Sequence, residues 1–160
     1  MAYHDDLLEQ AIQLVHKEPK NPKQASLRRA VSTAYYALFH LLINESVANW
    51  SLAKFRAALG RAFDHTTMKA ASNRIQDSRQ FPFIGEDPTV VAALKDVAKT
   101  FAQLQEKRHT ADYDNTTFWT RTEALKQVKS AEQAFITWRR IRSEQIAQAY
   151  LVSLVVKKRD

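Results

Sequence analysis

Hydrophobic residues recur every three or four positions along most of the chain, which is the spacing of one face of an α-helix. The first stripe predicts a helix over about residues 4–17. Its apolar members are Leu7, Leu8, Ala11, Ile12, Leu14 and Val15. A second helix is expected from Pro22 to about Ala48. Asn21 offers its N-cap, and Gln24 occupies the position of a capping-box partner.

The middle of the chain is expected to hold two short helices and one long loop. The short helices are predicted over about 51–62 and 64–76, the second one capped by Asp64. The stretch 77–87, DSRQFPFIGED, contains both a proline and a glycine and is predicted to be a loop.

Two further helices have clear start signals. Asp87 and Pro88 repeat the order of cap and proline, and begin a helix that is expected to end near Ala111. The sequence TRTE at 120–123 is a capping box. It opens a last helix that is expected to continue without a break towards Val156.

No segment alternates apolar and polar residues for long enough to predict a strand. The fold class predicted is therefore all-α, an antiparallel up-and-down bundle of four to five main helices with short extra helices. Neither a repeat nor a linker divides the chain, so residues 1–160 are expected to form a single domain.

Composition narrows the functional classes. The chain has two glycines and no cysteine, which disfavours a glycine-rich phosphate loop and excludes thiol catalysis, disulfides and thiolate metal sites. We expect a cytoplasmic protein with no membrane segment, because the start lacks a secretory pattern and no apolar run is long enough to span a bilayer. The formal net charge of +7 suits a nucleic-acid partner, and also a basic protein with a charged tail.

The second predicted helix carries a polar ladder beside a wide apolar face. The apolar face consists of Leu27, Val31, Ala34, Leu38 and Leu41, widened by Tyr35, Phe39 and Leu42. This width suggests a homodimer that buries the excess. The ladder, in steps of three or four, consists of Arg29, Ser32, Tyr36 and His40. It indicates a ligand cleft or a subunit interface, although the large amphipathic side chains could also make ordinary hydrogen bonds in the core.

The stretch LQEKRHTADYD, residues 104–114, ends a helix face that is otherwise hydrocarbon. Continuing the helical step from Leu104 places Arg108 and then Asp112 on the buried side, one turn apart. His109 and Tyr113 form the next such pair. Arg108 and Asp112 could be a structural ion pair. Alternatively, arginine could hold a phosphate and histidine could transfer a proton.

Two other groups of charged residues could bind a ligand or a metal. Arg139, Arg140 and Arg142, with Lys157, Lys158 and Arg159, could follow a nucleic-acid backbone or form a solvated face. Asp64, His65, His109 and Asp112 make no recognisable metal-binding motif, so neither a metal nor another cofactor is expected.

The segments RRAVSTAYYALFHLL, residues 28–42, and RHTADYD, residues 108–114, resemble a HEPN (higher eukaryotes and prokaryotes nucleotide-binding) domain. The resemblance implies an antiparallel helical bundle that usually dimerises, with the second motif facing a shared cleft. Many relatives are metal-independent ribonucleases, often toxins or defence effectors. Others bind nucleotides or act as partners of small nucleotidyltransferases.

The ribonuclease members resemble one another in an arginine followed, after four to six residues, by a histidine. Arg108 matches the arginine, but Tyr113 stands where the shortest version places the histidine. The resemblance therefore implies three alternatives. The chain could be a variant ribonuclease that uses Arg108 with His109 or Tyr113, attack by the ribose 2′-hydroxyl requiring no metal. It could be a nucleotide- or RNA-binding module, acting with a nucleotidyltransferase or antitoxin, or a structural helical partner. Residues predicted to contact a ligand are Arg108, Asp112, Arg29, Ser32, Tyr36 and His40.

Overall fold

A computed structural model of the chain describes residues 1–81 and 83–157. Within these ranges the chain forms α-helices, one short 3₁₀ helix and no strand, which confirms the predicted all-α helical bundle. The helices, in chain order, are α1 (Tyr3–Val15), α2 (Gln24–Ala48), η1 (Ala53–Phe55), α3 (Arg56–Gly60), α4 (His65–Arg74), α5 (Pro88–Tyr113), α6 (Arg121–Ile141) and α7 (Gln145–Ser153).

The chain divides into two compact units, and each unit is assembled from two separate stretches of sequence. Unit 1 comprises Met1–Leu41 and Gln103–Phe135, and unit 2 comprises Leu42–Ala102 and Ile136–Asp160. Helices α2, α5 and α6 therefore each contribute residues to both units.

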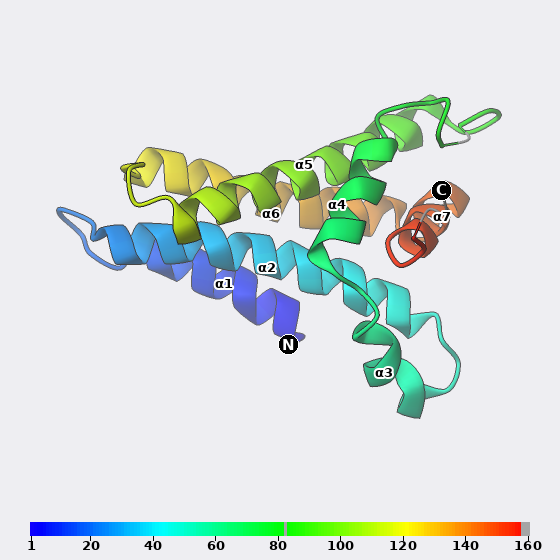
Figure 1. Ribbon diagram of the computed structural model, residues 1–160, viewed down its shortest axis with the longest axis horizontal. Coiled ribbons are helices and arrows are strands. Elements are labelled where there is room, and N and C mark those ends of the chain that lie inside the picture. The colour runs from blue at the N-terminus through cyan, green and yellow to red at the C-terminus, as the bar shows by residue number, and fades with distance from the viewer. Residues whose placement is uncertain (82, 158–160) are drawn as a thin grey trace. The chain divides into compact units, whose positions relative to one another are not determined.

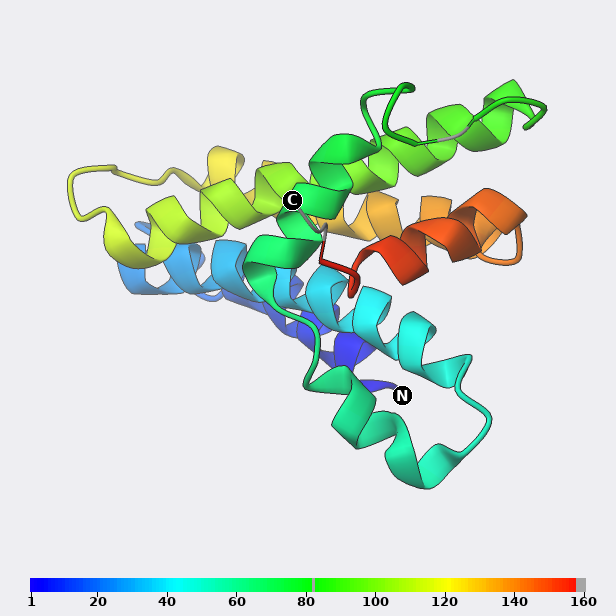
Figure 2. The ribbon, with the colours of Figure 1, turned by 45° about the vertical axis from the view of Figure 1, so that its right-hand side comes forward.

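Unit 1 contains α1, the first part of α2, the end of α5 and most of α6. Within it α1 and α2 run in opposite directions, and so do the end of α5 and the beginning of α6 (Figure 1). The turned view in Figure 2 shows the same pairing. Its buried side chains follow the apolar stripes of the sequence and include Ala11, Val15, Leu27, Val31, Ala34, Leu38, Leu104, Val128 and Phe135.

The wide apolar face predicted for α2 is buried by the chain itself. Tyr35, Phe39 and Leu42, the residues that widen this face, are all buried. The inference that α2 has apolar surface to spare is therefore wrong, and it no longer supports a homodimer. The homodimer stays a prediction that rests on the family resemblance.

Unit 2 contains the end of α2, the short helices η1, α3 and α4, the first part of α5, the end of α6, and α7. Here the prediction of one unbroken helix after residue 120 is wrong. Helix α6 ends at Ile141, and α7 begins at Gln145. The turn allows α7 to pack against α4 and places the Tyr150 ring 6.4 Å from the Trp138 ring.

Tyr150 is fully buried in unit 2. The Ser72 hydroxyl donates to the carbonyl oxygen of Met68 at 2.8 Å, so its 2.7 Å hydrogen bond with Tyr150 is donated by the phenol. Burial raises the pKa of Tyr150 well above its ordinary value, because the buried tyrosinate would lose its hydration. The phenol is therefore a neutral donor inside the core.

We expect Tyr150→Phe to lower the free energy of unfolding by about 1 kcal/mol, because the core loses one neutral hydrogen bond while the ring is retained. Urea unfolding followed by circular dichroism measures the change. Tyr113→Phe, on an exposed tyrosine, is the matched control and should leave the unfolding midpoint unchanged. Equal stability of the two variants would contradict the role given to the buried phenol.

Most predicted helix starts are confirmed. The Asp64 carboxylate accepts a hydrogen bond from the Thr67 amide at 2.7 Å and so caps α4. The predicted capping box before α6 forms in both directions between Thr120 and Glu123, each at 3.2 Å. Asp87 likewise accepts from the amide of the first turn of α5, at 2.7 Å.

The start predicted for α2 is wrong. The helix begins at Gln24, and Asn21 has a positive φ of 50° instead of an N-cap conformation. The Gln24 side chain makes no capping box, because it is bonded to the backbone of Trp119. Its amide nitrogen donates to the Trp119 carbonyl at 2.7 Å, and its oxygen accepts from the Trp119 amide at 3.0 Å.

The short helices and the loop differ from the prediction in detail. The segment expected to be helical over 51–62 forms only η1 and α3. Residues 77–81 and 83–87 form the predicted loop, with Gly85 at a φ of 81° that favours glycine. Pro82, part of the same expectation, lies outside the described residues. No helix in the described part of the chain has the length and hydropathy needed to cross a bilayer.

Candidate functional site

A cavity of about 500 Å³ opens between α1 and α2 in unit 1. All four residues of the predicted polar ladder line it, because their spacing puts them on one strip of α2. The lining residues are Tyr3, Leu7, Gln10 and Leu14 from α1, and Arg29, Ser32, Thr33, Tyr36 and His40 from α2. The structure thus brings the ladder to one site and adds a second wall from α1 that the sequence analysis missed.

The two ends of this cavity differ in chemistry. At one end the rings of Tyr3 and His40 meet edge to face, with centroids 4.9 Å apart and planes at 63°. Tyr36 lies beside them, its ring centroid 6.4 Å from that of His40. Arg29, eleven residues before His40, is exposed at the other end. At 1.5 Å per residue, the basic and aromatic ends are separated by about 16 Å along α2.

Arg108 of α5 packs against two tyrosines of α2. Its guanidinium carbon is 5.3 Å from the centroid of the Tyr35 ring and 5.8 Å from that of Tyr36, within the range of cation–π attraction. Only 11% of its side chain is exposed. Its Nε is buried and has no hydrogen-bond acceptor among the described residues. The guanidinium is therefore held by aromatic faces, with part of its donor capacity unused.

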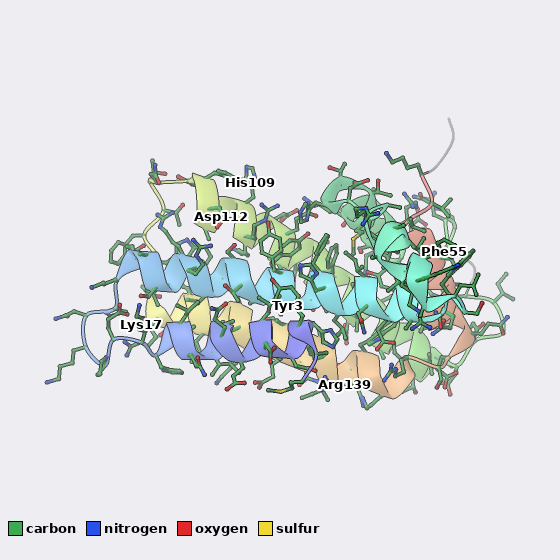
Figure 3. The ribbon with its side chains drawn as sticks, turned by 90° about the horizontal axis from the view of Figure 1, so that it is seen from below. Tyr3, Lys17, Phe55, His109, Asp112 and Arg139 are labelled. Atoms are coloured by element: carbon green, nitrogen blue, oxygen red, sulfur yellow. The ribbon has the colours of Figure 1, made fainter. Side chains whose placement is uncertain are left out.

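The ion pair predicted between Arg108 and Asp112 is long. The Nη1 atom lies 3.8 Å from Oδ2 of Asp112, whereas charge-assisted hydrogen bonds are typically 2.7–2.9 Å. The same Oδ2 accepts a 3.2 Å hydrogen bond from the Ser32 hydroxyl. Figure 3 shows Asp112 on one side of α2 and Tyr3 on the other. Ser32 and Tyr36 therefore belong both to the cavity and to the surroundings of Arg108 and Asp112.

His109 and Tyr113 form the ring pair expected from their spacing, with centroids 4.9 Å apart. Both side chains are exposed. In Figure 3 His109 lies farther from α2 than Asp112 does. The structure thus places this pair on the solvent side of α5, while Arg108 packs on the tyrosines of α2. A catalytic role for His109 or Tyr113 stays a prediction.

The end of α5 is held in place by Arg28, which the sequence analysis did not single out. Its Nη1 donates to the carbonyl oxygens of Ala111 at 3.0 Å and Asp114 at 2.7 Å, and its Nη2 donates to that of Thr117. Hydrogen bonds from Thr116 and Thr117 also lower the pKa of the Asp114 carboxyl to about 2. Arg28 thereby fixes the turn that follows Arg108 and Asp112.

The basic residues of unit 2 are partly engaged. Arg139 and Arg140 are exposed near the end of α6. Arg142 forms a 2.7 Å ion pair with Glu45, whose side chain is only 10% exposed. The tail residues Lys158 and Arg159 lie outside the described residues. A nucleic-acid role for this face stays a prediction.

No group of three histidine, aspartate or glutamate side chains within the described ranges is placed to hold a metal ion. Comparison with known proteins gives no relative: no protein-family model, no curated protein and no solved structure matches the chain. The class of protein that fold and site define is therefore a helical bundle with an open cavity, aromatic at one end and basic at the other.

Proposed function

We propose that this chain is a HEPN-like module that binds a nucleotide or a short RNA segment. The ligand would lie in the cavity between α1 and α2, with Arg108 beside it. We further propose that the module acts with a protein partner, such as a nucleotidyltransferase or an antitoxin, in a toxin–antitoxin or defence system. The observation that carries the ligand-binding proposal is the incompletely bonded guanidinium of Arg108, which packs on the ring of Tyr36. Tyr36 in turn lines the cavity together with Arg29 and His40.

The state of Arg108 favours an anionic ligand over a purely structural role. A buried donor such as Nε that has no acceptor costs free energy, and the Asp112 carboxylate lies 3.8 Å from Nη1, beyond hydrogen-bond distance. A phosphate group can accept two parallel hydrogen bonds from a guanidinium. Binding of such a group would therefore satisfy donors of this guanidinium.

The aromatic end of the cavity favours binding of a nucleotide base. Unpaired bases bind by stacking on aromatic side chains, and tyrosine and histidine both serve in this way. Tyr3 and His40 supply such rings, while Arg29 supplies a cation about 16 Å away along α2. This span accommodates a base and sugar at the aromatic end with a chain of phosphates reaching towards Arg29.

Reversing the charge of Arg29 tests the proposal. Arg29→Glu should weaken binding of a nucleoside triphosphate or a short single-stranded RNA by about tenfold or more, because the phosphates would face a carboxylate. Isothermal titration calorimetry measures the affinity. Lys126→Glu is the matched control, since Lys126 is also exposed in unit 1 but lies outside this cavity.

Both substituted residues are exposed, so the two variants should melt at the wild-type temperature. Equal weakening by both substitutions would show that only the net charge matters and would overturn the site. A wild-type protein that binds neither probe would overturn the function itself.

A further inference from the structure

A second cavity, of about 510 Å³, lies in unit 2 where the end of α2 meets α3 and α7. Its surface is predominantly apolar. The buried side chains of Phe63 and Leu151 and the half-buried Leu59 line it, and Trp50 and Val152 stand at its rim. Of its polar residues, Asn49 and Gln148 bond to each other at 2.7 Å. This cavity therefore suits a hydrophobic side chain better than a polar small molecule.

The apolar side chains at the rim of the cavity are largely exposed to solvent. Trp50 is 51% exposed and Val152 is 62% exposed. The same chain segments also expose Leu52, Phe55 and Val156. Single exposed apolar residues are ordinary, but several on the segments that form one cavity are typical of a surface that binds another protein.

The charges on these segments are mostly positive. Lys54 and Arg61 are exposed. Asp64 is the one acidic residue between positions 48 and 64; its carboxylate caps α4 and lies 3.9 Å from the Lys157 ammonium, with which it forms an ion pair. The carbonyl oxygens of Ala48 and Trp50 are covered by hydrogen bonds from Arg56. A partner with carboxylates around a hydrophobic anchor would complement this distribution of charge.

We propose that this cavity is the docking site for an acidic amphipathic helix of a partner protein. An aromatic or leucine side chain of that helix would enter the cavity between Trp50 and Val152. Acidic side chains flanking it would face Lys54 and Arg61. Docking of an apolar helix face into a hydrophobic groove is a recurrent mode of peptide recognition, and a buried aromatic anchor commonly carries most of the affinity.

Selection from a displayed library of helical peptides tests the proposal. Peptides are selected on the wild-type protein and then sorted by their binding to two variants on α7. Ala149→Trp fills the cavity, whereas Gln145→Trp adds the same side chain at an exposed position that does not line it. Val152→Glu changes an exposed residue at the rim of the cavity, and it places a charge there without adding a large side chain. Circular dichroism confirms that each variant is folded.

The expected peptides bind the wild type and Gln145→Trp but not Ala149→Trp or Val152→Glu. They should carry net negative charge and apolar residues at helical spacing. Combined reversal of Lys54 and Arg61 to glutamate should weaken their binding by about tenfold or more. The proposal is overturned if no selected peptide loses its binding to Ala149→Trp and Val152→Glu. This holds even if a hydrophobic dye binds in the cavity and is displaced by these substitutions. It is also overturned if the peptides that bind in the cavity carry no net negative charge, or if they bind the charge-reversed variant as tightly as the wild type. Both results are independent of nucleotide binding in unit 1.

Discussion

Arg108→Ala is expected to abolish binding of nucleotide or RNA while lowering the free energy of unfolding by only about 1–2 kcal/mol. The small cost reflects the loss of two cation–π contacts, with Tyr35 and Tyr36. A tightly buried ion pair would behave differently, because removal of one partner would strand the other and cost about 3–5 kcal/mol. The 3.8 Å separation from Asp112, whose side chain is 29% exposed, argues against such a pair.

Urea unfolding and isothermal titration calorimetry on the same samples separate the two effects. Arg108→Lys is the informative control, because lysine keeps the charge but cannot offer the planar, two-pronged donor. We expect it to retain stability and to lose most of the affinity. If Arg108→Ala unfolds the protein and an added Asp112→Ala restores it, the pair is structural and the ligand role of Arg108 is wrong.

Among single substitutions of residues that are not fully buried, Arg28→Ala is expected to lower the free energy of unfolding the most, by about 3 kcal/mol. The guanidinium satisfies carbonyl oxygens at Ala111, Asp114 and Thr117, and alanine leaves all of them without this donor. Because hydrogen bonds to a charged group contribute about 1.5–3 kcal/mol each and do not add fully, the expected total is well below their sum.

Arg29→Ala is the matched control for this experiment, since it removes the adjacent arginine from an exposed position. It should change the unfolding midpoint little. Amide hydrogen exchange should also quicken over residues 111–117 in Arg28→Ala alone, because the turn after α5 loses its anchor. Similar unfolding curves for the two variants would show that Arg28 does not hold this turn.

Local features of the fold could be predicted from sequence because they depend on residues close together in the chain. The cap at Asp64 and the capping box at Thr120 and Glu123 each join residues three positions apart, and both form as expected. The break between α6 and α7 could not be predicted in this way. No proline or glycine marks it, and it is favoured by the contact of Tyr150 with Ser72, 78 residues earlier.

In the candidate site, too, the features that depend on neighbouring residues could be predicted, and those that depend on distant residues could not. The ladder on α2 follows helical spacing, so its residues could be placed on one surface from sequence. The wall from α1 carries no such signal, because Leu7 and Leu14 look like ordinary members of an apolar stripe. The role of Arg28 could not be predicted from the sequence either, because the carbonyl oxygens that accept its hydrogen bonds lie 83 or more residues further along the chain.

The assembly of each unit from two separate stretches has a consequence for the folding rate. Helical proteins usually fold within microseconds to milliseconds because most of their contacts are local. Here Gln24 is bonded to Trp119, 95 residues away, so the first unit cannot be completed until a long loop has closed. We expect folding on the slow side for an all-α chain of this length. Neither unit corresponds to a contiguous fragment, so no single cut in the chain could release one of them whole.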